Sequence, residues 1–159
     1  GDGAMKVRLV NKLKDLNLQN VTMLDAIPKA AVPKHINIAD VALIPLKKKD
    51  TFKKVLPSKI FENAAMAKPI LLGVEGEAKE VVESFNAGLA FEPENKTDFL
   101  EKLESIVSDK KQYGEFQEGG MRLAEAFDRR ILAFKMYGVI ESVLYASINV
   151  KESGKVTNF

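Results

Sequence analysis

The segment LPSKIFENAAMAKPILL, residues 56–72, contains a helix start, a helix and the strand that follows it. Pro57 and Ser58 are start signals, because proline suits the first turn of a helix and serine accepts hydrogen bonds from free helix amides. Pro69 disfavours helical backbone in the residue before it, so the helix is expected to end near Ala67. A buried strand is expected over residues 70–72. The segment therefore predicts one helix-to-strand step of an α/β fold.

Three more short apolar runs lie on either side of this segment, at residues 21–24, 41–45 and 89–91. They lack strict polar alternation, which is typical of strands buried on both faces of a parallel sheet. Helical patterns precede the strands, over residues 5–16, 33–39, 58–67 and 77–86. Because strands that alternate with helices form βαβ units, the sequence predicts an α/β fold with a doubly wound, Rossmann-like parallel sheet of about four strands.

Only helices are predicted after residue 91. Apolar spacing indicates helices over residues 97–108 and 113–126, and the low helix propensity of glycine predicts an interruption or fraying at Gly119-Gly120. A long helix from about residue 127 has one apolar face, which is expected to pack in a core or against another domain. That face comprises Ala133, Met136, Tyr137, Ile140, Val143, Leu144 and Ile148. The expected boundaries are one domain over residues 1–148 and a flexible polar tail over residues 149–159.

The composition argues against several classes of function. Lys and Arg (24) nearly balance Asp and Glu (22), and a net charge of +2 is unlike that of a dedicated nucleic-acid binder. The chain has no cysteine and a single histidine, His35, so disulfides, thiolate metal sites and histidine triads are excluded, and His35 is expected to be structural. No acidic cluster predicts a metal site. No apolar run is long enough to span a bilayer and no signal peptide is recognised, so the expected location is the cytoplasm.

Three polar residues of the helix after Pro57 indicate a ligand site. Ser58, Lys59 and Glu62 lie away from the apolar face at residues 60, 61, 64 and 65, which is expected to pack on the sheet. Free amides, a hydroxyl and an ammonium at a helix start favour phosphate, and a carboxylate one turn further can accept both hydroxyls of a ribose. These groups together predict a nucleoside diphosphate. The alternative is that Ser58 only caps the helix and that Lys59 and Glu62 form an exposed ion pair.

An ordered series of short motifs favours the ligand site. The motifs are Gly1-Asp2-Gly3, NVTMLDAIP (20–28), ADVALIP (39–45), PSKIFE (57–62), AKPI (67–70), EGE (75–77), AGL (87–89) and PEN (93–95). In this order they resemble an N-terminally truncated C-terminal, donor-binding domain of the retaining GT-B glycosyltransferases, of the glycosyl transferases group 1 (family 4) type. The resemblance implies a hexosyltransferase-like enzyme of polysaccharide biosynthesis that takes a UDP- or GDP-sugar as substrate and needs no cofactor.

The resemblance also implies roles for individual residues. Glu62 would bind the ribose, Ser58 and Lys59 would lie beside the diphosphate, and Ile27 would lie against the base. The full implied nucleotide-binding set is Glu62, Lys59, Ser58, Pro57, Ile27, Asp25 and Gly3. Many relatives have a donor-sugar glutamate eight positions before the ribose glutamate, where this chain has Lys54. Lys54, Gly76 and Glu77 are therefore the candidates for sugar or phosphate contacts, and no catalytic residue is assigned.

The sequence leaves more than one interpretation open for partners other than the nucleotide. The lysine-rich run, residues 47–54, is either a solvated loop or a segment that attracts the diphosphate or anionic lipid, which leaves open a peripheral contact of the parent protein with the inner face of the membrane. The chain does not begin with methionine. It is expected to be inactive alone, with a saccharide or lipid-linked acceptor bound by a separate N-terminal domain.

Two alternatives and one assembly mode remain open at this stage. A sheet that lacks its first strands would expose an edge through which the chain could self-associate. The alternative functions are a non-catalytic Rossmann-like binding or scaffold module and another GT-B nucleotide-sugar enzyme, such as an epimerase.

Overall fold

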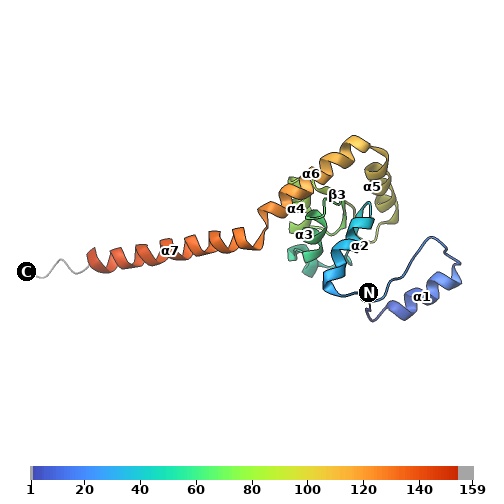
Figure 1. Ribbon diagram of the computed structural model, residues 1–159, viewed down its shortest axis with the longest axis horizontal. Coiled ribbons are helices and arrows are strands. Elements are labelled where there is room, and N and C mark those ends of the chain that lie inside the picture. Colours follow the sequence, from blue (N-terminus) through green and yellow to red (C-terminus); the bar gives the residue numbers. More distant parts are fainter. Residues whose placement is uncertain (1, 154–159) are drawn as a thin grey trace, which may run out of the picture. The chain divides into compact units, whose positions relative to one another are not determined.

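The computed structural model describes residues 2–153, which divide into two units between Ala39 and Asp40. Each unit is described on its own. The first unit contains helix α1 (Lys6–Asp15), the short 3-10 helix η1 (Lys29–Ala31) and helix α2 (Val32–Ile38) (Figure 1). The α1 and α2 helices therefore fall where the sequence predicts them, within two residues at each end.

The strand predicted over residues 21–24 is wrong, because the chain there has no regular secondary structure. Val21 is 43% exposed and Leu24 is 52% exposed, so the run is not buried either. A strand needs a neighbour that takes its backbone N–H and C=O groups, and these residues belong to no sheet in the described part of the chain. An apolar run shows that a segment can be buried, but it does not supply the neighbouring strand.

The second unit is built on a parallel sheet with the strand order β1-β2-β3. The strands are β1 (Ala42–Pro45), β2 (Ile70–Gly73) and β3 (Gly88–Ala90). The 3-10 helix η2 (Asp50–Lys54) and helix α3 (Ser58–Ala64) connect β1 to β2, and helix α4 (Glu77–Ser84) connects β2 to β3. The predicted α/β class with a parallel sheet is confirmed, with three strands in the described residues in place of about four.

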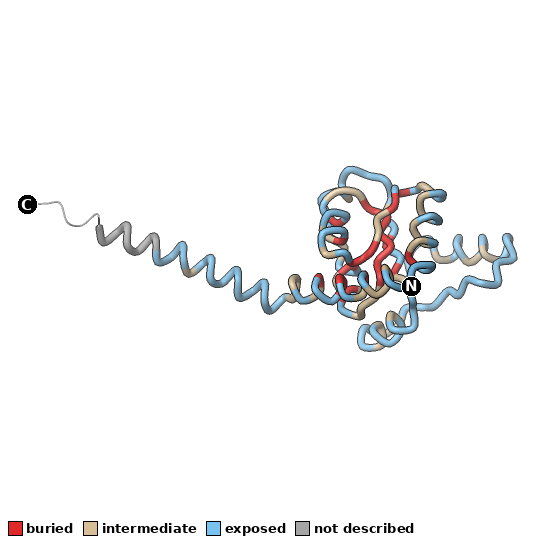
Figure 2. The backbone as a smooth tube through the Cα atoms, turned by 90° about the horizontal axis from the view of Figure 1, so that it is seen from above, coloured by how far each residue is buried: buried red, intermediate tan, exposed pale blue. Residues whose placement is uncertain are grey.

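Helices cover both faces of the sheet, and β2 is buried along its whole length. Ile70 and Leu72 lie in a core cluster with residues of α3, α4 and the later helix α6, whereas Leu71 lies in a second cluster with residues of α5 and α6. Figure 2 shows these buried stretches in red, gathered in the second unit. Since successive residues of β2 enter different clusters, the continuous apolar run of residues 70–72 is explained by a sheet packed on both sides.

Three helices follow the sheet: α5 (Lys96–Ser108), α6 (Lys110–Ala126) and α7 (Arg129–Ser153). The prediction that Gly119-Gly120 interrupts the second of them is wrong, because α6 continues through both glycines and buries them. A Cβ atom at Gly119 would lie 2.0 Å from the carbonyl oxygen of Asn86. The glycine therefore permits α6 to pack directly on the turn after α4, and the packing outweighs its low helix propensity.

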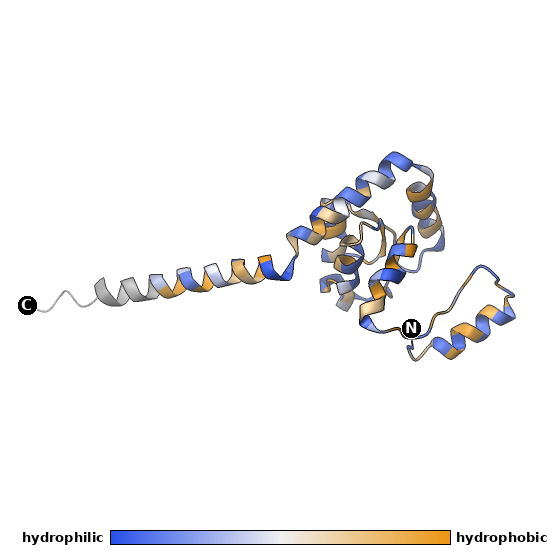
Figure 3. Ribbon diagram, in the orientation of Figure 1, coloured by the Kyte–Doolittle hydropathy of each residue, from blue (hydrophilic) through white to orange (hydrophobic). Residues whose placement is uncertain are grey.

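The apolar face of α7 is not packed in a core of the described chain, and its predicted packing against another domain stays a prediction. From Arg129 to Tyr145 every residue except Glu141 is exposed, including Met136 and Ile140. Figure 3 shows hydrophobic residues, in orange, along this part of α7. The side chain of Ile148 lies outside the described residues, as does residue 154 onward. The tail predicted from residue 149 begins inside α7, which continues to Ser153. Within residues 2–153, no helix combines the length and the apolarity that a membrane span requires.

Candidate functional site

The carboxyl ends of the three parallel strands meet at one edge of the sheet, which we call the carboxyl edge. Leu46 follows β1, Val74 follows β2 and Phe91 follows β3 at this edge. Because α3 and α4 connect parallel strands, each must run back across the sheet and begin at the carboxyl edge. Open α/β sheets bind ligands at this edge. The start of α3 is therefore placed where the sequence analysis predicts a ligand site.

The α3 helix has a buried and an exposed face. Ile60 and Ala64 are fully buried against the sheet, and Ser58, Lys59 and Glu62 are exposed. The other two residues of the predicted apolar face are less buried than Ile60 and Ala64, since residue 61 is half-buried and residue 65 is exposed. The polar residues nevertheless share the outward side of α3, so a ligand outside the carboxyl edge can reach them.

Ser58 does not cap α3 with its side chain, and that part of the prediction is wrong. The N-cap position is occupied by Pro57, whose backbone is extended (φ −62°, ψ 129°), and no side chain accepts a hydrogen bond there. A capping hydroxyl must come from the residue before the first helical one, whereas Ser58 is itself the first helical residue. The helix start is thus left without a side-chain acceptor for its amides.

The exposed ion pair between Lys59 and Glu62 is not formed. Among residues 2–153, neither side chain makes an ion pair, and the carbonyl oxygen of Lys59 instead accepts a hydrogen bond from the Asn63 side chain at 2.7 Å. The alternative to a ligand-binding role, in which Lys59 and Glu62 only pair with each other, is therefore wrong. Both charges remain exposed on the outward side of α3.

The predicted residues of the first unit form their own small network. The ammonium of Lys6 lies 3.3 Å from the Asp2 carboxylate and also pairs with Asp25. The hydrogen bond from Lys6 is the main reason why the pKa of Asp25 lies below its usual range. Ile27 is half-buried, and Gly3 has open space around it. Asp25 is thus engaged by a lysine of its own unit, and the nucleotide-binding roles of these three residues stay predictions.

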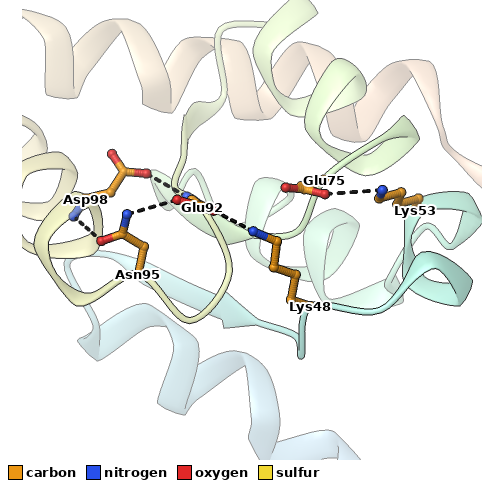
Figure 4. Close-up of polar contacts among 6 residues, drawn as sticks. All are labelled: Lys48, Lys53, Glu75, Glu92, Asn95 and Asp98. Carbon is orange, nitrogen blue, oxygen red and sulfur yellow. Dashed lines mark hydrogen bonds and ion pairs between the residues drawn. The ribbon is translucent and has the colours of Figure 1, made fainter.

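A polar cluster at the carboxyl edge escaped the sequence analysis (Figure 4). The Lys48 ammonium lies 2.5 Å from one carboxylate oxygen of Glu92, and the Asn95 amide donates to the other oxygen at 2.9 Å. Asn95 in turn caps α5 by accepting hydrogen bonds from the backbone of Thr97 and Asp98. The hydrogen bond from Lys48 is the main reason why the pKa of Glu92 is lowered. The pair joins residues 44 positions apart, a distance at which sequence patterns carry no pairing signal.

The structure divides the lysine-rich run into two groups. Lys48 pairs with Glu92, and Lys53 pairs with Asp50 at 2.9 Å and with Glu75 at 3.6 Å. The other three lysines are exposed and make no ion pair with any described residue: Lys47, Lys49 and Lys54. The run is therefore neither wholly solvated nor wholly available to an anion.

Gly76 and Glu77 lie where β2 meets α4. Gly76 has a positive φ of 79°, and a Cβ atom there would lie 2.4 Å from the carbonyl oxygen of Lys53. Glycine is therefore required by the close approach of two backbone segments. Glu77 is exposed as the first residue of α4. Neither observation tests the predicted sugar or phosphate contact.

A groove of about 570 Å³ lies beside the end of β1. Its lining includes Leu43, Phe91 and Phe99, together with Lys47 and Lys96. None of the predicted nucleotide-binding residues lines this groove. Since its walls are mainly apolar, its chemistry does not suit a diphosphate, and the candidate site remains the outward side of α3.

A parallel sheet whose connecting helices begin at its carboxyl edge is the arrangement of Rossmann-like ligand-binding domains. Residues 1–122 match the model of the family described as glycosyl transferases group 1. The chain belongs to the glycosyl transferases group 1 family. No curated protein matches the chain.

Two solved structures share the fold. The chain is 19% identical to sucrose-phosphate synthase from Thermosynechococcus elongatus, with a TM-score of 0.74 over 92% of this chain and 36% of that one. It is 17% identical to the C-terminal domain of LpcC, a glycosyl transferase group 1 family protein from Francisella tularensis, with a TM-score of 0.59 over 77% of this chain and 62% of that one. The fold is that of a GT-B glycosyltransferase domain, and the chain spans less than two thirds of either relative's length.

Proposed function

We propose that this chain is the donor-binding part of a glycosyltransferase and that Glu62 binds the ribose of a nucleotide sugar. Family membership supports the class of reaction. The observation that carries the residue assignment is the state of Glu62, an exposed carboxylate on the outward side of α3 with no ion-pair partner among residues 2–153. A carboxylate in this state can accept hydrogen bonds from both ribose hydroxyls without breaking an internal contact.

The neighbouring residues suit the diphosphate. Lys59 supplies an unpaired ammonium and Ser58 a hydroxyl at the start of α3. Positive groups that are already in place stabilise the charge on a departing nucleoside diphosphate, which is the chemical demand of sugar transfer. Lys54, which is also exposed and unpaired in the described chain, would add to this charge. The nucleotide-binding roles of Ile27, Asp25 and Gly3 in the first unit stay predictions from the sequence.

The transferred hexosyl group would pass to a saccharide or lipid-linked acceptor in cytoplasmic polysaccharide biosynthesis. Transfer requires both substrates to be positioned and water to be excluded. Because the chain spans only 36% and 62% of the two related structures, we propose that a further domain binds the acceptor and that this chain alone is inactive. The unpaired Lys47 and Lys49 are the residues that support a peripheral contact with an anionic membrane.

Self-association through the outer edge of β1 has weaker support. The backbone amides of Ala42 and Leu46 donate to the carbonyl oxygens of Pro69 and Gly73, on the side of β2. The amides on the opposite side of β1 therefore belong to Leu43 and residue 45. Residue 45 is proline and has no N–H group. An edge with proline is a poor template for another strand.

The ribose assignment is tested by varying protein and ligand together. Calorimetry measures the affinity of the nucleotide that binds, UDP or GDP, and of its 2′-deoxy analogue. Both ligands are titrated into the original chain and into Glu62→Ala. We expect the original chain to favour the ribonucleotide by about tenfold, as one lost charge-assisted hydrogen bond predicts. The preference should vanish in Glu62→Ala. An unchanged preference in the variant would show that another residue recognises the ribose.

A further inference from the structure

The η2 helix and the turn between β2 and α4 touch through their backbones. A Cβ atom at Gly76 would lie 2.4 Å from the carbonyl oxygen of Lys53 and 3.0 Å from its Cα. Contacts this close between backbone atoms allow no side chain in between. Because η2 and α4 also pack against each other, Lys53 lies at a fixed junction between the segment before α3 and the end of β2.

A charge pair crosses the same junction. The Lys53 ammonium lies 3.6 Å from the Glu75 carboxylate on the β2 side (Figure 4). It also lies 2.9 Å from Asp50 within η2. Both carboxylates raise the pKa of Lys53, and the hydrogen bond that Lys53 donates to Asp50 is the larger cause. The two pairs differ in what they join, since Asp50 lies on the same element as Lys53 and Glu75 lies on another.

The junction is close to the candidate site along the chain. Only residues 55–57 separate η2 from α3. Leu56 packs on the core and Pro57 has its φ fixed by its ring, so this short connection has little freedom. A shift of η2 is therefore transmitted to the start of α3, and with it to Lys59 and Glu62.

We infer that Glu75, Gly76 and Lys53 form a latch that holds η2 on the β2–α4 turn and so positions Lys59 and Glu62 for the nucleotide. They act as positioning residues that need not touch the ligand. The inference rests on the proposed function for its ligand. The Lys53 and Glu75 side chains are 48% and 38% exposed, so their pair contributes little to global stability, and its effect is on the placement of α3.

Glu75→Gln and Asp50→Asn form a matched pair of variants. Each substitution removes one of the two carboxylates that pair with Lys53. Only Glu75→Gln removes the ion pair that joins η2 to the β2–α4 turn. We expect Glu75→Gln to speed amide hydrogen exchange in α3 without ligand and to weaken UDP or GDP binding by about two- to fivefold, the range of an exposed pair. Asp50→Asn should leave both quantities unchanged, and neither variant should shift the urea midpoint.

A charge exchange completes the test. Lys53→Glu combined with Glu75→Lys, made in the Asp50→Asn chain to avoid repulsion within η2, should restore both α3 protection and affinity. Equal effects of Glu75→Gln and Asp50→Asn would overturn the latch, as would weaker binding without faster exchange in α3, which would mean that Glu75 touches the ligand. If the chain binds a nucleotide through Glu62, and Glu75→Gln changes neither the affinity nor the exchange in α3, the latch is wrong and the proposed function stands. If it binds neither nucleotide, the proposed function fails and the positioning role fails with it.

Discussion

Glycine, which has no side chain, decides how closely some helices and turns of the second unit approach one another. Gly119 lies in the middle of α6, where a Cβ atom would meet the carbonyl oxygens of Asn86 at 2.0 Å and Phe85 at 2.4 Å. These are backbone atoms that cannot rotate away. Gly114 lies on the same helix with nothing within 4 Å of its Cβ position. The same residue type therefore has opposite consequences at two positions of one helix.

We expect Gly119→Ala to destabilise the protein by about 1–3 kcal/mol, because α6 must shift away from the turn after α4. Gly114→Ala should stabilise it by about 0.5–1 kcal/mol, since alanine favours an open helical position. Urea unfolding followed by circular dichroism measures both changes. Equal effects of the two substitutions would contradict the packing role assigned to Gly119.

The residues of α3 show what sequence reasoning can and cannot reach at this scale. Its helical projection places Ser58, Lys59 and Glu62 outward, as observed, because a period of 3.6 residues fixes which residues share a face. It does not fix the first helical residue, so Ser58 was expected to cap and instead begins the helix. A shift of one residue decides whether a serine hydroxyl can cap, and sequence signals rarely locate a helix end so closely.

At the scale of elements, the parallel sheet could be predicted and its pairing partners could not. The apolar runs that form β1, β2 and β3 are visible in the sequence, but only β2 is buried along its whole length, since the residues of β1 alternate between buried and exposed. The run at residues 21–24 is also mainly apolar, yet it lies outside the sheet. The Lys48–Glu92 pair likewise depends on the end of β3 reaching the segment after β1, which only the folded sheet brings about.

The Lys48–Glu92 pair predicts a pH dependence of stability. The folded pKa of Glu92 lies below the ordinary 4.5, so the pair stabilises the protein above that pH and the contribution is lost as the pH falls through the folded pKa. We expect the urea midpoint to fall more steeply between about pH 5 and pH 3 in the original chain than in Glu92→Gln. Because both side chains are about half exposed, about 1 M salt should narrow the difference. Parallel pH profiles for the two proteins would show that the pair contributes nothing to stability.

At the scale of the whole molecule, the chain has the fold of one GT-B domain, and the proposed site accounts for the donor side of a sugar transfer. The outward side of α3 offers an exposed carboxylate and an exposed ammonium, neither of which pairs with a described residue, and this suits the nucleotide of a sugar donor. Nothing comparable is identified in the described residues for an acceptor, and the related structures are longer than this chain. Nucleotide binding is therefore the activity by which this chain can be judged.

The central claim is tested by titrating UDP and GDP into the chain and into two variants, with binding followed by calorimetry. Glu62→Ala removes the proposed ribose ligand. As a matched control, Glu101→Ala removes an exposed glutamate of α5 that makes no ion pair within residues 2–153. We predict that one nucleotide binds, that Glu62→Ala weakens its binding by about tenfold or more, and that Glu101→Ala does not. Thermal unfolding should be the same for all three proteins. Binding that is equal with and without Glu62, or no binding of either nucleotide, would contradict the account.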